Sequence, residues 1–326
     1  MCTKLFVSAI SVVLLVLGGV ASSAKAACSV VLSPGASIQV ALENPAYATI
    51  CLAPGTYQLS NQLTIPDGKI LEGTGTGRDE VVLQSSADIA VYLHSNTQIK
   101  NLRIQNERGF IPTYGVLTYY TNNVIIWGLR VLGSDINIGI NGSRNVHVWD
   151  TFMAMNGRNN GEADPNLWIT DAHDIEILWG EALGRNNGPS GDGEIAAYQS
   201  TNVSIYGTYV TNSGASAIYL VDCDGCKVEN TTIVNANEWG LDIVNGSDNF
   251  IAKNNRVSNS YYAGSVFNGS GYSGVNRSGQ YIGNDFRNNN RSGTRSFCNG
   301  ITYSGSLTEL TLSGNTGNHV LQCKAW

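Results

Sequence analysis

A short sequence pattern recurs six times between Val116 and Val257, and it limits the folds open to this chain. Each copy has an alternating apolar run, then a turn residue, then a Val-x-Ile-like triplet. The copies are centred on Val124, Val146, Ile175, Val203, Cys226 and Phe250, at steps of 22 to 29 residues. A period in this range is typical of a solenoid, in which each repeat buries its apolar face only by stacking on its neighbours.

The repeats predict β-strands rather than helices, because their apolar residues recur at a period of two. Apolar columns lie eight and six positions before the centres, and the column between them is mixed. We therefore expect Ile138, Ile169, Ile195 and Leu220 to face the core, and the residues between them to face solvent. A third apolar column, seven positions after the centres, runs from Val131 to Val257 and predicts a third short strand in each turn.

Asn, Asp or Gly stands immediately before the centre of every copy, as at Asn123, Asn145 and Asn202. Asn tolerates the left-handed backbone region and hydrogen-bonds its own backbone, so this position predicts a tight turn. Stacked Asn side chains can also form amide ladders. We therefore interpret the many Asn residues as structural.

Residues 1–26 have the layout of a secretory signal peptide, with Lys4, an apolar run over 5–20 and a small-x-small cleavage site at 24–26. We expect a secreted protein, extracellular or periplasmic, in which residues 27–326 form a single elongated domain. No later apolar run is long enough to span a bilayer, so no membrane contact is expected after signal removal. The net charge is −6 and Lys and Arg are scattered, which argues against a nucleic-acid partner. We expect a monomer.

Six cysteines follow the signal: Cys28, Cys51, Cys223, Cys226, Cys298 and Cys323. Their order suggests one disulfide between Cys28 and Cys51 and another between Cys298 and Cys323. Each would staple one end of the solenoid, where strand edges are exposed. The remaining pair is open, because a local disulfide and a buried thiol at Cys226 both fit the pattern.

The start of the chain carries a family resemblance. Residues 36–44 have apolar side chains at helical spacing, and Pro54-Gly55-Thr56-Tyr57 and Leu71-Glu72-Gly73 follow them. Together they resemble the opening of the right-handed parallel β-helix proteins of the pectate-lyase-like superfamily, and the later repeats continue that resemblance. It implies an all-β, right-handed parallel β-helix with a short N-terminal capping helix. It does not fix the function, since this superfamily contains lyases, hydrolases, epimerases and adhesins.

The outward positions of the first strand in each repeat form a candidate glycan-binding face. Trp168 and Tyr219 share a column with Ala196 between them, so their rings should lie about 10 Å apart, with Tyr198 to one side. Such rings suit the apolar faces of sugars, although exposed aromatic residues can also simply stack along a sheet. The same face is predicted to carry Asn141, Asn166, Glu194 and, if the turn between Leu241 and Phe250 holds one extra residue, Asp242.

Three lengthened loops, over residues 105–114, 156–166 and 184–193, precede first strands, and insertions on one edge of a solenoid usually build its binding face. They bring charged residues to this edge: Arg158, Asp164, Arg185 and Asp192. The run Asn145–Asp150 also resembles the Val-Trp-Ile-Asp-His run of pectate lyases, which implies that Asp150 is a calcium ligand. The His of that run is Thr151 here.

These residues predict a polysaccharide lyase that cleaves a uronate-containing glycan by β-elimination. Such a reaction needs a cation on the uronate carboxylate, a base, and assistance to the leaving oxygen. Calcium on Asp150, Asp164 and Asp192 would supply the cation. Catalytic roles are assigned to four residues: Arg158, Arg185, Glu194 and Tyr198.

Three alternatives remain open on the same fold. A glycoside hydrolase would use two carboxyls, for example Glu194 with Asp192, Asp164 or Asp242. A uronan epimerase is the second alternative. The third is a non-catalytic surface or matrix protein that binds glycan through the same groove. The identity of the polysaccharide is not readable from the sequence.

Overall fold

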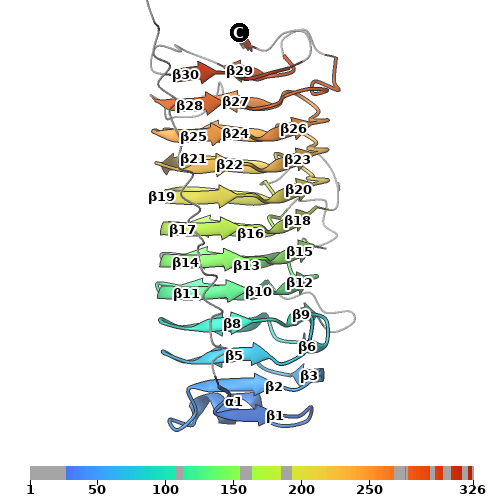
Figure 1. The fold of residues 1–326 in the computed structure, drawn as a ribbon, viewed down its shortest axis with the longest axis vertical. Helices are drawn as coiled ribbons and strands as arrows, with labels where there is room; N and C mark the ends of the chain where they lie inside the picture. The colour runs from blue at the N-terminus through green and yellow to red at the C-terminus, as the bar shows by residue number, and fades with distance from the viewer. Residues whose placement is uncertain are drawn as a thin grey trace, which may run out of the picture.

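The chain winds into an elongated right-handed parallel β-helix, whose turns stack along one axis (Figure 1). The computed structural model describes residues 27–106, 113–154, 164–184, 193–267, 276, 278–293, 298–303, 310–317 and 322–324. The expected all-β solenoid is confirmed. Residues 1–26, the expected signal peptide, lie outside the described part.

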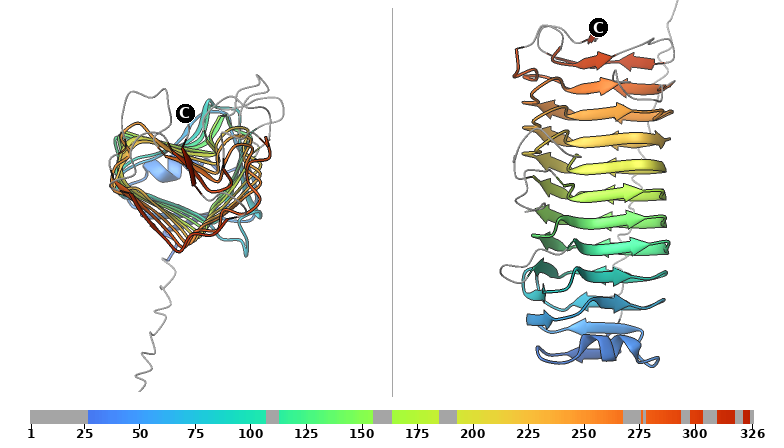
Figure 2. Two further views of the ribbon diagram at one scale, coloured as in Figure 1. Left: turned by 90° about the horizontal axis from the view of Figure 1, so that it is seen from above. Right: turned by 180° about the vertical axis from the view of Figure 1, so that it is seen from behind.

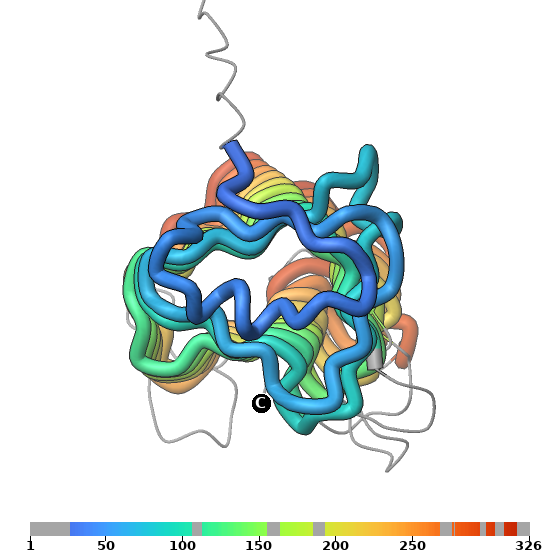
Figure 3. Tube along the Cα trace, turned by 90° about the horizontal axis from the view of Figure 1, so that it is seen from below, coloured from blue at the N-terminus to red at the C-terminus, as the bar shows by residue number. Residues whose placement is uncertain are grey.

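Each turn gives strands to three parallel columns, and the turns superimpose when viewed along the axis (Figure 2, Figure 3). The first column contains β4 (Leu63–Ile65), β7 (Ile89–Leu93), β10 (Tyr114–Tyr119), β13 (Ile136–Asn141), β16 (Leu167–Thr170), the first half of β19 (Ile195–Tyr206), β21 (Ile218–Asp224), β24 (Leu241–Val244), β27 (Ser265–Phe267), β29 (Ile301–Tyr303) and β31 (Gln322–Lys324).

The second column continues from the first around a corner, and β19 passes through that corner without a break. It contains β1 (Val30–Leu32), β2 (Thr49–Leu52), β5 (Ile70–Gly73), β8 (Gln98–Lys100), β11 (Asn122–Trp127), β14 (Arg144–Trp149), β17 (His173–Leu178), the second half of β19, β22 (Lys227–Glu229), β25 (Phe250–Lys253), β28 (Gly279–Ile282) and β30 (Leu310–Ser313).

The third column is a separate nine-stranded sheet. It contains β3 (Gly55–Leu59), β6 (Val81–Ser85), β9 (Arg103–Asn106), β12 (Arg130–Leu132), β15 (Phe152–Ala154), β18 (Glu181–Leu183), β20 (Tyr209–Thr211), β23 (Thr232–Val234) and β26 (Arg256–Ser258).

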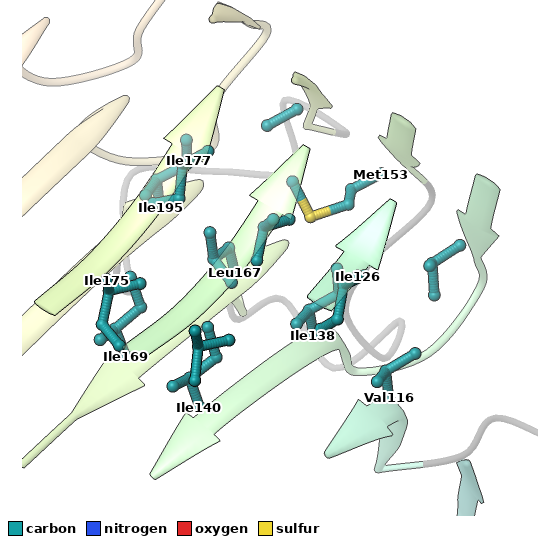
Figure 4. Packing of buried hydrophobic residues seen from close by; sticks show 14 of the residues in the cluster. Val116, Ile126, Ile138, Ile140, Met153, Leu167, Ile169, Ile175, Ile177 and Ile195 are labelled. Atoms are coloured by element: carbon teal, nitrogen blue, oxygen red, sulfur yellow. The ribbon is translucent and has the colours of Figure 1, made fainter. Parts of the chain in front are cut away.

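The interior of the coil is filled by the apolar columns that the alternation predicts. Ile138, Ile169, Ile195 and Leu220 are each at most 1% exposed, as expected. Figure 4 shows side chains from successive turns pointing into this shared interior. Burial of each such side chain stabilises the fold by about 1.5–3 kcal/mol. No single turn encloses a core of its own, so this stabilisation depends on stacking.

The N-terminal end is covered by the expected helix, α1 (Ile38–Glu43). Its buried residues Ile38, Ala41 and Leu42 continue the solenoid core, and Ser37 caps its first turn by accepting a hydrogen bond from the Val40 amide. The helix therefore closes the apolar interior, which would otherwise open to water at this end.

The disulfide predicted between Cys28 and Cys51 is present. Of the two readings left open for the central pair, the disulfide is correct, because Cys223 is bonded to Cys226.

At the C-terminal end, Cys298 is buried, with its Sγ 3.6 Å from Thr302 Oγ1. The backbone of Cys323 pairs in register with Thr302. The side chain of Cys323 lies outside the described part, so the second predicted staple stays a prediction.

The turn that joins the first two columns contains the predicted ladder of left-handed Asn residues. Asn123 and Asn145 have φ values of 58° and 51°. Asn145 Nδ2 donates to Asn123 Oδ1 at 2.7 Å, and Asn123 Nδ2 donates to Asn96 Oδ1 at 2.9 Å. Asn202 Nδ2 donates to Asp174 Oδ1 in the same way at 3.0 Å. Asn therefore provides both the backbone conformation and the bond between turns.

Replacing Asn145 by Ala should lower the free energy of unfolding more than replacing it by Gly. Both changes remove the ladder bond, worth about 0.5–1.5 kcal/mol. Ala adds the cost of a left-handed β-carbon, about 1–2 kcal/mol, which Gly avoids. Urea unfolding followed by circular dichroism measures both variants. Equal losses for Ala and Gly would contradict the role given to the left-handed backbone.

Candidate functional site

The outward face of the first column carries a continuous group of aromatic rings. Trp168 pairs in register with Ala196, which pairs with Tyr219, so the predicted column is confirmed. Tyr198 fills the gap between the two rings, where the sequence had placed it to one side. Its ring stacks on Trp168 at 4.9 Å between centroids and meets Tyr219 edge-on at 5.5 Å. The three half-buried rings form one surface rather than two separate platforms.

Asn166 and Glu194 are buried, at 0% and 2% exposed, so the prediction that they line an outward groove is wrong. They stand just before the first inward residue of their strands, at the corner where alternation has not yet begun. Asn137 Nδ2 donates to Asn166 Oδ1 at 2.6 Å, and Asn166 Nδ2 donates to Glu194 Oε2 at 2.6 Å. Glu194 therefore belongs to a buried hydrogen-bonded row that crosses three turns.

Asn141 lies at the end of β13, half-buried, and pairs in register with Thr170. Thr170 in turn pairs with Tyr198. Asn141 is therefore in the outward column of Tyr198, two turns below it, as the alternation predicts.

Asp242 continues the aromatic surface one turn beyond Tyr219, with which it pairs in register. It is 4% exposed, and the Ser216 hydroxyl donates to its Oδ2 at 3.1 Å. Its Oδ1 is buried and has no hydrogen-bond partner in the described part of the chain. Burial raises the pKa of the Asp242 carboxyl to about 7; the Ser216 bond opposes this rise and the Glu238 carboxylate adds to it. We call Trp168, Tyr198, Tyr219 and Asp242 the aromatic–acid strip.

Glu238 is a second carboxyl at the acidic end of the strip, and the sequence analysis missed it. Burial raises its pKa as well, and a hydrogen bond with Ser216 opposes that rise. One hydroxyl therefore joins the two carboxyls. Glu238 is half-buried, so it is the more accessible of the two. Burial raises the pKa of Tyr262 and the Glu238 charge adds to that rise; the Tyr262 ring lies 5.0 Å from that of Trp239. Neither Glu238 nor Ser216 belongs to a column that the repeat reveals.

The structure describes only some of the charged residues proposed for lyase chemistry. Arg158, Arg185 and Asp192 lie outside the described residues. Asp164 is half-buried just before β16, at the corner between the third and first columns. Asp150 is exposed at another corner, between β14 and β15, where it lies 3.7 Å from Arg78. The structure therefore does not bring Asp150 and Asp164 to the same corner.

Among the described residues, no group of three Asp, Glu, His or Cys side chains is arranged to hold a metal ion. Within the same residues, no helix is long and apolar enough to cross a membrane.

Comparison with known proteins identifies the fold. No protein-family model matches the chain. No curated protein matches its sequence. The Dettilon tailspike protein (gp208) is similar over 82% of this chain and 60% of its own, at 15% identity and a TM-score of 0.63. The Agl-KA catalytic domain is similar over 85% of this chain and 62% of its own, at 13% identity and a TM-score of 0.58.

A third similar structure is the A-module of the mannuronan C-5 epimerase AlgE4 from Azotobacter vinelandii. It matches over 90% of this chain and 95% of its own, at 15% identity and a TM-score of 0.51. The chain thus spans about the whole of this module but only 60–62% of the other two structures. At these identities the likeness shows a shared fold.

The stability of the protein should carry a pH dependence that comes from Asp242. The Asp242 carboxyl has a pKa of about 7 in the folded chain and an ordinary value of 3.8, so between these two pH values the native state holds a proton that the unfolded state has lost. This contribution is full below pH 3.8, falls by about 1.4 kcal/mol per pH unit above it, and is gone once the pH has passed about 7. The difference in unfolding free energy between wild type and Asp242→Asn, measured across this range, isolates it. A difference independent of pH would contradict the raised pKa.

Proposed function

We propose that this protein is a secreted enzyme that acts on a polysaccharide bound along the aromatic–acid strip. The observation that carries the proposal is the register of the strip, in which the rings of Trp168, Tyr198 and Tyr219 lead directly to Asp242. Neighbouring turns are about 4.8 Å apart, so an extended sugar chain can lie across the rings and reach the half-buried Glu238, whose carboxylate interacts with the buried Asp242. Aromatic faces pack against the apolar faces of sugars, while polar groups fix their orientation.

Glu238 and Asp242 are proposed as the acid–base pair. A carboxyl whose pKa is near neutral can give up or take a proton at working pH, which general acid–base catalysis requires. Glu238 is half-buried and so accessible enough to meet the substrate, whereas Asp242 is only 4% exposed. The Ser216 hydroxyl, which bonds to both carboxyls, provides a path for the proton between them.

Hydrolysis is the reaction that these residues favour. Glycoside hydrolysis uses a neutral carboxyl to protonate the leaving oxygen and a second, ionised carboxyl as nucleophile or base. Burial and, to a smaller extent, the Glu238 carboxylate raise the pKa of Asp242 to about 7, so below that pH Asp242 keeps its proton and the pair can hold one neutral and one charged carboxyl.

β-Elimination is the second candidate, and the position of Tyr198 favours it. Its hydroxyl is part of the strip itself, where it would transfer a proton at the sugar. A calcium ion beside Asp164 would neutralise the uronate. Epimerisation begins with the same proton abstraction and ends with reprotonation instead of bond cleavage.

Purified protein incubated with polygalacturonate, alginate and α-1,3-glucan, with and without EDTA, separates the candidates. We expect new reducing ends without the ultraviolet absorbance of an unsaturated uronate, because the acid pair favours hydrolysis. Absorbance that EDTA abolishes would instead identify a calcium-dependent lyase. Retention on one glycan without any reaction would identify a non-catalytic binding protein and would refute the enzymatic proposal.

Glu238→Gln should lower the turnover rate by about 10²–10⁴-fold, because it removes the proton-transferring group. Asp242→Asn should also lower it, and should shift the pH of maximal activity, because the two carboxyls are electrostatically coupled. Glu229→Gln is the matched control, since Glu229 is also half-buried but lies in the second column. Wild-type rates in Glu238→Gln would remove this pair from the mechanism.

A further inference from the structure

A second line of aromatic side chains runs along a different edge of the coil, at the corner between the second and third columns. Trp127 ends β11 and pairs in register with Trp149, which ends β14. Trp149 pairs with Leu178, and Leu178 pairs with Tyr206 on β19. Trp179 directly follows Leu178, so four successive turns each place a ring at this corner. We call Trp127, Trp149, Trp179 and Tyr206 the aromatic corner.

Three of the four rings are exposed, and Trp149 is half-buried. Trp127, Trp179 and Tyr206 are 46%, 61% and 38% exposed. A row of large aromatic side chains in water is unfavourable unless it serves an interaction, and such patches usually mark binding sites.

Trp179 keeps its ring at the corner in spite of an unfavourable backbone. Its φ is 53°, in the left-handed region that a bulky side chain rarely adopts. The equivalent positions on neighbouring turns are Gly128, Asp150 and Gly207. A β-carbon on Gly207 would lie 2.8 Å from Trp179 Cδ1, so the indole ring covers that glycine closely. Strain of this kind persists mostly at functional positions.

Trp149 is held in place by its polar neighbours. Its Nε1 donates to Glu176 Oε2 at 2.9 Å, and the same oxygen lies 3.0 Å from His147 Nδ1. Lys100 Nζ lies 6.0 Å from the centre of the Trp127 ring. The corner thus combines fixed aromatic faces with hydrogen-bonding groups beside them, and a ligand that binds here needs both apolar and hydroxyl-bearing surfaces.

We propose that the aromatic corner is a second glycan-binding site, which holds an extended polysaccharide chain along the solenoid axis. Sugars present apolar C–H faces to the rings and hydroxyls to Glu176, His147 and Lys100. The ligand class rests on the function proposed above, but the site is separate from the aromatic–acid strip, which faces outward from the first column. Polymer held here would raise the effective concentration of the same chain at the strip.

The test compares the double variant Trp127→Ala/Trp179→Ala with wild type by electrophoresis through gels that contain polygalacturonate, alginate or α-1,3-glucan. We expect the affinity for the retained polymer to fall at least tenfold in the double variant. Cleavage of short oligosaccharides should stay at the wild-type rate, because they reach only the strip. The unfolding midpoint should change little, since the removed rings are largely exposed.

Tyr120→Ala is the matched control. Tyr120 is 66% exposed, has a φ of 50° and covers Gly142 just as Trp179 covers Gly207. It does not continue a line of rings, because the next turn places Asn141 and Gly142 there. This variant should therefore keep wild-type retention.

Wild-type retention in the double variant would overturn the proposal, as would a wild-type protein that binds none of the three polymers. A change of oligomeric state in sedimentation, without a change in retention, would assign the corner to a second copy of the chain. Retention that the double variant loses, in a protein that cleaves none of the polymers, would uphold this site and refute the enzymatic function. Turnover together with retention that depends on Trp168 alone would uphold the enzymatic function and refute this site.

Discussion

The hydrogen bonds between successive turns determine the rest of this structure. Within each column the described strands pair in parallel with their neighbours above and below, except at the two ends, and the register is one residue to one residue, as for Ile138 between Val116 and Leu167. Because the register is kept from turn to turn, a side chain's place in its repeat decides whether it is buried, half-buried or exposed. Core, polar rows and binding surfaces are therefore all straight lines parallel to the axis.

Polar side chains can enter such a core where they bond along these lines. Asn137, Asn166 and Glu194 satisfy one another across three turns at a corner, so their burial leaves few unpaired groups. Asp242 is different, because one of its oxygens is buried without a partner. The solenoid tolerates that cost at one end of the aromatic surface, and the result is a carboxyl whose pKa lies near neutrality. The burial of this carboxyl destabilises the fold locally, and the same burial raises its pKa into the range that acid–base chemistry uses.

Period and alternation were sufficient to predict the three columns and, once one extra residue is allowed in the last turn, the register of Asp242 opposite Tyr219. Helical spacing predicted the capping helix, and Asn before the repeat centres predicted the left-handed turns. These patterns were not sufficient at the corners, where alternation stops. Asn166 and Glu194 were therefore assigned to the wrong environment. Glu238 lies in a turn before β24 with no counterpart in the repeat, so no sequence pattern could place it beside Asp242. The sequence placed Tyr198 in the correct outward column. It did not predict that its ring contacts both Trp168 and Tyr219, between which the small Ala196 lies.

Positions where local preference and the fold disagree are the most informative about function. Most non-glycine residues with positive φ in the described chain are Asn or Asp, which tolerate that backbone at little cost. Tyr120, Gln199 and Trp179 are the exceptions among the described residues. Of these, Trp179 extends a line of rings over neighbouring turns. The neighbouring turns form the same left-handed backbone with Gly or Asp, so the backbone does not require a tryptophan at position 179. We therefore attribute Trp179 to its side chain.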